Sequence, residues 1–304
     1  MLDRYVRQVR LLVQVLPYIF ADDAFALKGG TAINLFYRDL PRLSVDIDLT
    51  YLPIEDRETS LRKIDDSLDR IMGSITETGR FRAQRIAGGG NNDTRIQVSD
   101  GAANIKIETS PVTRGTILPP QNMVTCDAVT DQFGFAEIPV VSFEDLYGGK
   151  LHAALDRQHP RDLFDIKLLY ENEGLTDDLF RLFMVYVASS GRPMHELLSS
   201  TTPLNEALYD AEFVGMTREE VSLEELQRAR TRLHEDIKAG LTGDVAEFLL
   251  TLHDAEPDFN LIGLPDAAQL PAVRWKLLNL EKLKSQNAEK HREQRMALED
   301  LFDR

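Results

Sequence analysis

Strand-forming and helix-forming patterns occupy different parts of this 304-residue chain. Residues 44–51, SVDIDLTY, alternate strictly between polar and apolar side chains, which is typical of a strand with one face in a core. From Ser142 onward the apolar residues recur at helical spacing instead, and they do so to the end of the chain. The sequence therefore predicts an α+β fold, in which a strand-rich α/β half is followed by an all-helical half.

The same patterns predict the individual elements. Strands are expected at residues 24–27, 44–51, 80–87, 93–99 and 103–109, with the glycine-rich segment 88–92 as a turn. Helices are expected at residues 2–20, from Thr31 through Tyr37, at 57–78, from Ser142, from Pro160, and at 176–188, 222–239, 243–253 and 266–302. We place the domain boundary near residue 172, which gives a catalytic domain over residues 1–172 and a helical domain over residues 173–304.

The composition excludes several classes of protein. A single cysteine, Cys126, rules out an intrachain disulfide and a cysteine-rich metal site, and it suits the cytoplasm, where we expect the protein to be. No segment approaches the roughly 18–20 uncharged apolar residues of a membrane span, and the arginine-bearing N-terminal segment does not resemble a signal peptide. With 50 acidic against 35 basic residues the net charge is −15, which argues against a protein whose main task is coating nucleic acid but allows a local basic groove.

Candidate metal ligands lie in the alternating segments. Asp46 and Asp48 should point to one side of a strand, while the aliphatic residues between them face the core. Neighbouring carboxylates repel each other unless a cation lies between them, and oxygen ligands without a nearby histidine favour Mg²⁺ or Mn²⁺ over zinc. Glu108 is a candidate third carboxylate on an adjacent strand. A solvated strand face with chance acids is the alternative explanation.

A glycine turn is suited to binding phosphate. The segment Lys28-Gly29-Gly30-Thr31 joins a buried strand to a helix. Glycines at a helix N-terminus let a phosphate approach the backbone N–H groups. The segment lacks the G-x-x-x-x-G-K-[ST] pattern of a Walker A loop, and a simple tight turn would have the same sequence.

A fourth group of charged residues lies further along the chain. Lys150 and Arg157 share one helix face, and Asp162 and Asp165 lie one turn apart on the next helix. The two cations and two acids fit a triphosphate clamp beside a carboxylate that positions the acceptor. They fit a salt-bridge seam between two helices equally well.

Together these segments resemble the AbiEii/AbiGii-type nucleotidyltransferases, the toxin halves of bacterial toxin–antitoxin pairs, within the DNA polymerase β-like nucleotidyltransferase superfamily. The superfamily pattern is an apolar strand, a Gly-Gly or Gly-Ser pair that opens a helix, Asp-x-Asp on the next strand, and a later acid. The narrower pattern is LKGGTA(I/L)NL, then R-x-S-x-D-I-D-L, then K-x-x-A-x-x-x-R-x-x-x-R-D-x-x-D. This sequence matches it at Leu27 to Leu35, at Arg42 to Leu49, and at Lys150, Ala153, Arg157, Arg161, Asp162 and Asp165. The resemblance covers residues 25–170 and implies a nucleotidyltransferase fold, with a mixed sheet flanked by helices.

The resemblance also implies a reaction and the residues that carry it. A nucleoside monophosphate would pass from an NTP to an acceptor hydroxyl, and pyrophosphate would leave. The Mg²⁺ or Mn²⁺ ligands would be Asp46, Asp48 and Glu108. The nucleotide would be bound by Lys28, Gly29, Gly30, Thr31, Ser44, Lys150 and Arg157. Asp162 and Asp165 would orient Lys150 or Arg157 or position the acceptor, so the catalytic set is Asp46, Asp48, Glu108, Lys150, Asp162 and Asp165.

By the same resemblance the acceptor would be the 3′ end of a tRNA, and a cognate antitoxin would be a partner. The sequence adds a basic stretch at residues 274–295, with seven Lys or Arg against three Glu and with Trp275 near its start. This stretch could follow an RNA backbone, or it could be a solvated helix face. The alternatives for function are a nucleotidyltransferase acting on a protein or a small molecule, a non-catalytic NTP-binding module, and a toxin that acts by sequestration.

Overall fold

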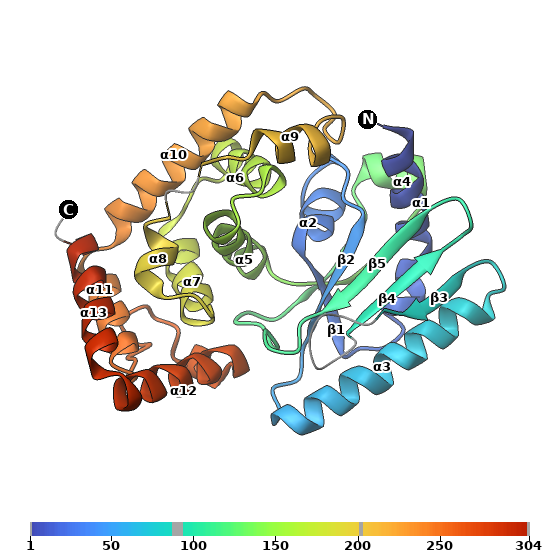
Figure 1. Cartoon of the computed structure of the whole chain (residues 1–304). Helices are drawn as coiled ribbons and strands as arrows, with labels where there is room; N and C mark the ends of the chain where they lie inside the picture. Colours follow the sequence, from blue (N-terminus) through green and yellow to red (C-terminus); the bar gives the residue numbers. More distant parts are fainter. Residues whose placement is uncertain (1, 87–93, 201–202, 303–304) are drawn as a thin grey trace. The chain divides into compact units, whose positions relative to one another are not determined.

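Seven strands form one mixed sheet in the structure, a computed structural model that describes residues 2–86, 94–200 and 203–302 (Figure 1). The strands are β1 (Phe25–Lys28), β2 (Asp46–Tyr51), β3 (Arg82–Arg85), β4 (Arg95–Ser99), β5 (Asn104–Thr109), β6 (Gln121–Val124) and β7 (Glu137–Val140). Their order is β3-β4-β5-β2-β1-β7-β6. The β2–β5 and β1–β7 pairs are parallel, and the other neighbours are antiparallel.

Helices precede, interrupt and follow the strands. They are α1 (Asp3–Ile19), α2 (Gly29–Ala32), the π-helical turn η1 (Ile33–Tyr37), α3 (Arg57–Glu77), α4 (Asp127–Phe133), α5 (Phe143–Asp156), α6 (Pro160–Asn172), α7 (Asp177–Ala188), α8 (Met194–Leu198), α9 (Glu206–Glu212), α10 (Leu223–Gly240), α11 (Gly243–His253), the 3₁₀ turn η2 (Pro265–Gln269), α12 (Pro271–Gln286) and α13 (Ala288–Phe302). In the described part of the chain no strand follows β7. The predicted α+β fold, a mixed sheet followed by helices, is confirmed. Among the described residues no helix is long and apolar enough to cross a membrane.

The predicted strands at 24–27, 44–51, 80–87, 93–99 and 103–109 correspond to β1 to β5, while five described elements were not predicted. These are β6, α4, β7, α8 and α9, each only four to seven residues long, and β7 contains Pro139, a residue that disfavours strands. The long helix predicted at 266–302 is three elements, because the chain leaves helical geometry at Leu270 and again at Asn287. The predicted turn 88–92 lies outside the described residues.

The two faces of the sheet differ in the way that the alternating sequence requires. In β4 and β5, Ile96, Val98, Ile105 and Ile107 are buried, whereas the residues between them are not. On this apolar side, Arg85 of β3 forms ion pairs with α3, and Figure 1 shows α3 running along β3 and β4. The other side carries the charged residues of the candidate site.

The chain packs as two compact units. The first contains residues 1–146 and 213–220, and the second contains residues 147–212 and 221–304. The sheet with α1 to α4 belongs to the first unit, and α6 to α13 belong almost entirely to the second. The domain boundary near residue 172 is a different division of the chain, and it stays a prediction.

Two helix starts are set by the local features that the sequence indicated. Ser142 accepts a hydrogen bond from the backbone N–H of Asp145 at 3.1 Å, as an N-cap does. Pro160 is the first residue of α6, where its missing N–H costs nothing. These two starts determine which residues of α5 and α6 face each other, and so which charged side chains can meet.

Candidate active site

The acids predicted as metal ligands lie on one face of the sheet. Asp48 of β2 pairs with Lys28 of β1 on one side and with Glu108 of β5 on the other. Glu108 in turn pairs with Arg95 of β4. Because directly paired residues have their side chains on the same face, these four residues form one row. Asp46 lies two residues before Asp48 on this face, and we call the five residues the sheet cluster.

Glu108 is held between two cations. Its carboxylate accepts a hydrogen bond from Arg95 Nη2 at 2.7 Å and lies 2.9 Å from Lys106 Nζ. Burial would raise the pKa of the Glu108 carboxyl, but Arg95 and Lys106 outweigh burial and hold it below its usual value. The group is therefore an ionised carboxylate whose two oxygens each face a cation.

Asp48 and Lys28 are in a different electrostatic position. Burial raises the pKa of the Asp48 carboxyl, and the charges of Asp46 and Glu108 raise it further, against the opposing charge of Lys28. Burial also lowers the pKa of the Lys28 ammonium, although Asp48 and Glu108 oppose that shift. The positive charges of Lys28 and Lys106 thus do not fully offset the burial of Asp48 and its two acidic neighbours.

The glycine turn is shaped by its neighbours in the protein. Gly29 has φ +76°, and a Cβ at this position would lie 2.5 Å from Asp48 Oδ2. A Cβ on Gly30 would lie 2.6 Å from a guanidinium nitrogen of Arg42 and 3.0 Å from the Ser44 hydroxyl. Both glycines are therefore needed for the turn to approach β2 and the segment before it.

Two polar residues that flank the turn also fix its position. Thr31 is buried, and its hydroxyl contacts the Ser44 hydroxyl at 3.0 Å and the backbone carbonyl of Asp46 at 2.5 Å. Arg42 is only 2% exposed and donates to the Leu43 carbonyl at 3.0 Å. Reasoning from the sequence gave Arg42 no role, although it lies within the segment that matches the family pattern. Its guanidinium packs beside Gly30 and so helps to shape the turn.

Asp46 and Asp48 fit a divalent cation. Mg²⁺ and Mn²⁺ prefer oxygen ligands, and Mg²⁺ is often held by only one or two protein carboxylates together with substrate phosphates. A cation between the aspartates would also offset the burial and the acidic neighbours that raise the pKa of Asp48. Within the described residues, no group of three or more His, Cys, Asp or Glu side chains is arranged to hold a metal ion. The part of Glu108 as a third ligand stays a prediction.

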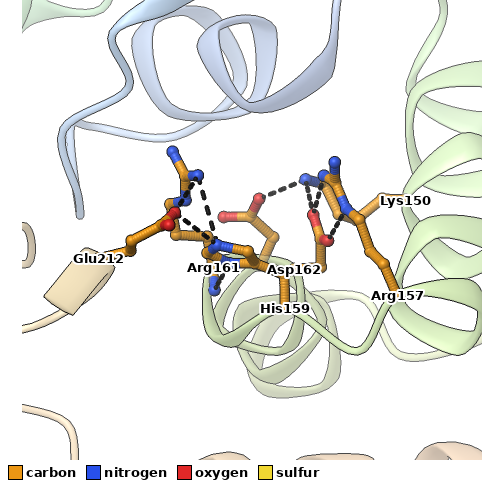
Figure 2. Close-up of polar contacts among 7 residues, drawn as sticks. Lys150, Arg157, His159, Arg161, Asp162 and Glu212 are labelled. Carbon is orange, nitrogen blue, oxygen red and sulfur yellow. Dashed lines mark hydrogen bonds and ion pairs between the residues drawn. The ribbon is translucent and has the colours of Figure 1, made fainter. Parts of the chain in front are cut away.

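The second group of predicted residues forms a compact ion network, which we call the helix cluster (Figure 2). Lys150 Nζ lies 2.8 Å from Asp162 Oδ1 and 2.9 Å from Asp165 Oδ2. Arg157 donates from Nε to Asp162 Oδ2 at 2.6 Å and from Nη2 to Asp162 Oδ1 at 3.0 Å. Lys150 and the two aspartates are at most 6% exposed, whereas the Arg157 side chain is 63% exposed. The structure thus brings all four of these predicted residues together.

The charges within the helix cluster are strongly coupled. Burial would raise the pKa of Asp162, but Lys150 and Arg157 outweigh it and hold this pKa far below the ordinary value. Asp162 also lies in the first turn of α6, where the helix dipole favours a negative charge. The network accordingly has the salt-bridge geometry between two helices that the sequence allowed, and it holds the Lys150 ammonium in one position.

A histidine at the start of α6 borders the helix cluster (Figure 2). His159 Nδ1 accepts from the backbone N–H of Arg161 at 3.1 Å, so the ring proton of the neutral tautomer is on Nε2. His159 Nε2 lies 3.1 Å from a Glu212 oxygen, which also accepts from Arg161 at 3.2 Å. His159 therefore caps the helix and ties α6 to Glu212, which is a structural role.

The basic stretch at residues 274–295 spans α12 and α13. Lys276 is buried and donates to two backbone carbonyls, and burial lowers its pKa to about 8. Lys284 donates to the Asp254 carbonyl, and Arg295 pairs with the Asp254 carboxylate. Trp275 is 53% exposed. Three of the seven cations thus serve packing within the helical unit.

Comparison with known proteins extends the resemblance beyond the motifs. The model of a family described as "Nucleotidyl transferase AbiEii toxin, Type IV TA system" matches residues 10–279. Among solved structures, the chain is similar to MenT4, a nucleotidyltransferase toxin from Mycobacterium tuberculosis H37Rv, with a TM-score of 0.60 and 15% identity over 91% of this chain and 93% of that one. At this identity the likeness concerns the fold. No curated protein matches the sequence.

The glycine turn yields the first prediction. Gly29→Ala should lower the free energy of unfolding by about 3 kcal/mol, because the new Cβ adds a clash with Asp48 to the strain of a positive φ. Gly79→Ala is the matched control, since Gly79 has φ +67° and nothing within 4 Å, and it should cost only about 1–2 kcal/mol. Urea unfolding measures both. Equal losses would show that the approach of the turn to Asp48 does not matter.

The helix cluster yields the second prediction. Because folding lowers the pKa of Asp162, its ionised form stabilises the fold above the ordinary value of 3.8, and the benefit is lost as the pH falls below that value. At neutral pH, Asp162→Asn should destabilise the protein by about 3 kcal/mol, and the difference from wild type should shrink below about pH 4. Urea unfolding over this pH range measures it.

The control for this measurement is Asp210→Asn, at an exposed position of α9. It should change the free energy of unfolding by less than about 0.5 kcal/mol across the range. A difference between wild type and Asp162→Asn that stays constant through the acid range would contradict the assignment.

Proposed function

Because the chain belongs to the AbiEii family of nucleotidyltransferase toxins, we propose that its sheet cluster transfers a nucleoside monophosphate from an NTP to an acceptor hydroxyl, with release of pyrophosphate. The observation that carries this proposal is the geometry of β2. Asp46 and Asp48 share one face of the strand, and the glycine turn is tied to them through Thr31 and Gly29. Two carboxylates on one strand face therefore lie beside a turn whose two glycines have no side chains.

Asp46 and Asp48 are the proposed ligands of Mg²⁺ or Mn²⁺. Such an ion would supply charge stabilisation to the phosphates and lower the pKa of the attacking hydroxyl. Glu108 is the third proposed ligand, and to take that part it has to give up Arg95 or Lys106. Either cation, once released, would be available to a phosphate oxygen.

The glycine turn and its neighbours are the proposed site for the NTP phosphates. The helical segment that begins at Gly29 continues through η1 to Tyr37, so the first N–H groups at its start favour an anion. The side chains that would add to this site are Lys28, from the last position of β1, and Ser44, which Thr31 holds in place. The proposed nucleotide-binding residues here are Lys28, Gly29, Gly30, Thr31 and Ser44.

For the helix cluster we propose that Lys150 and Arg157 neutralise negative charge that develops on the leaving pyrophosphate. Asp162 and Asp165 hold the Lys150 ammonium from two sides. The ammonium is therefore already in place before the reaction, and no entropy has to be lost to order it. Arg157 is bound to the same carboxylate, and its side chain is 63% exposed, so a ligand can reach its guanidinium. The two aspartates thus act as positioning residues.

The proposed acceptor is the 3′ end of a tRNA, and the proposed compartment is the cytoplasm. The family description places its members in type IV toxin–antitoxin systems, so an antitoxin is the expected partner. An RNA acceptor is consistent with a chain whose acidic charge is interrupted by local basic surfaces.

The reaction is tested by incubating the purified protein with each α-³²P-labelled NTP, Mg²⁺ and total tRNA. Label should move onto tRNA, and Asp46→Ala should reduce the rate by about 1,000-fold, because it removes a metal ligand. Asp66→Ala, at an exposed position of α3, is the matched control and should retain the wild-type rate. Transfer by Asp46→Ala at the wild-type rate would refute the site.

The other outcomes of this assay separate the alternatives. Pyrophosphate release that depends on Asp46 but leaves tRNA unlabelled would indicate a protein or small-molecule acceptor. Absence of turnover with every NTP would favour a non-catalytic NTP-binding module.

The helix cluster is tested through its exposed member. Arg157→Ala should lower the transfer rate by about 100-fold, because a charge that stabilises the transition state is lost. It should leave the fold intact, because Lys150 still pairs with Asp162. The matched control is Arg228→Ala, since the Arg228 side chain is 65% exposed and also pairs with a carboxylate, Glu224. If both variants transfer label at the same rate, Arg157 belongs only to the salt-bridge network.

A further inference from the structure

Polar side chains that the proposed reaction leaves mostly unused line one face of the β3-β4-β5 part of the sheet. The strand register aligns Gln84, Gln97, Lys106 and Asp46 in one row from the edge strand β3 to β2. We call the surface formed by Arg82, Gln84, Arg95, Gln97, Asn104 and Lys106 the polar sheet face. It leads directly to the two proposed metal ligands.

The polar sheet face is open to solvent. Arg82, Gln84 and Asn104 are exposed, and the side chains of Arg95 and Lys106 are 40% and 39% exposed. The isoleucines and valine that alternate with them point to the opposite side, where α3 packs on β3 and β4. The accessible side of these strands is therefore the side that carries the cations and the amides.

The charge of the polar sheet face is opposite to that of the chain. The whole chain has 50 acidic and 35 basic residues, whereas this face has three cations and no acid of its own. Two acids border it: Glu108, which is paired with Arg95 and Lys106, and Asp46, which is the strand partner of Lys106. A polyanion that is repelled by most of the surface would therefore find a favourable local potential here.

The residue types identify the chemistry of the partner. Arg, Lys, Gln and Asn are the side chains that contact phosphate oxygens and sugars of nucleic acids. Stacking of bases needs aromatic side chains, and none of the six positions has one. The face is thus suited to a phosphodiester backbone, which it would bind with little preference for base sequence.

We propose that the polar sheet face binds the phosphodiester backbone of an RNA acceptor and directs its terminal hydroxyl to Asp46 and Asp48. This inference rests on the proposed function, since it names the surface that the acceptor uses. Glu108 pairs with Arg95 and Lys106 beside the aspartates, and the cation that it gives up on binding the proposed metal remains on this face. The basic stretch on α12 and α13 is the alternative RNA surface. Three of its seven cations make contacts within the helical unit, and it has no register to the two aspartates of β2.

The test uses substitutions on the face but away from the sheet cluster. Arg82→Glu combined with Gln84→Glu changes the charge by three units and touches no proposed catalytic residue. The probe is a fluorescein-labelled single-stranded RNA, whose dissociation constant is measured by anisotropy over a range of salt concentrations. We expect the dissociation constant at low salt to rise about tenfold or more, and the salt dependence to flatten by about 0.7 for each lost phosphate contact.

A matched control makes the same exchanges elsewhere on the first unit. Arg62→Glu combined with Gln121→Glu uses exposed positions on α3 and on β6, the opposite edge strand of the sheet, and changes the net charge equally. This variant should bind RNA within about twofold of wild type. Arg82→Gln serves as a milder variant whose fold is undisturbed, and its loss of affinity should be smaller but in the same direction.

The transfer assay separates the inference from the proposed function. In the double variant the KM for the RNA acceptor should rise about tenfold, while the KM for NTP stays at the wild-type value.

If wild type transfers label to RNA and the double variant matches the control in binding and in KM, the inference is wrong and the proposed function stands. If wild type binds RNA through this face but labels none, the RNA-transfer activity is refuted instead. If wild type does not bind RNA, the inference is refuted directly.

Discussion

The parallel pairing of β2 with β5 is the constraint on which the candidate site depends. It sets Asp48 beside Glu108 and Ile47 beside Ile107. Because side chains alternate along a strand, a slip of one residue would turn the carboxylates into the core and the isoleucines into water. Burying an unpaired carboxylate costs several kcal/mol, so the hydrophobic core enforces the register that brings the acids together. The site geometry is in this sense a consequence of the core.

In both units a charged side chain lies between two groups of opposite charge. In the first unit Glu108 is flanked by Arg95 and Lys106, and in the second Lys150 is flanked by two aspartates. Such networks hold functional groups in place at low entropic cost to the reaction. They also mean that a ligand with charge has to compete with existing partners. On β2, burial and the charges of Asp46 and Glu108 raise the pKa of Asp48, so a bound cation is proposed there.

The acidic character of the chain and its proposed RNA acceptor are compatible once charge is considered locally. A net charge of −15 reduces non-specific attraction to nucleic acid, so binding depends on the few surfaces where cations gather. The polar sheet face has this character and shares its strands with the proposed metal site. Restricting the contact to one short basic surface would favour the end of an acceptor over the length of a duplex.

Local rules sufficed for much of the fold and part of the site. The helical period predicted Lys150 and Arg157 on one helix face, although α5 ends at Asp156 and the two cations meet at Asp162 instead. The two-residue period of a strand placed Asp46 and Asp48 on one face, because that relation lies within a single element. Ser142 and Pro160 indicated the starts of α5 and α6 for the same reason. The short strands β6 and β7 gave no comparable signal, since four residues have too little pattern to distinguish a strand from a loop, and β7 also contains a proline.

What only the tertiary structure decided were the relations between elements. Strand order placed Glu108 beside Asp48 and gave it Arg95 of β4 as a partner. Its other partner, Lys106, lies two residues before it on the same strand. Packing of the turn against β2 made Gly29 and Gly30 necessary for close approach, and it buried Arg42 beside them. The sequence by itself determined which residues could share a face. Which faces meet depends on distant segments burying their apolar sides together, and that is a property of the folded chain as a whole.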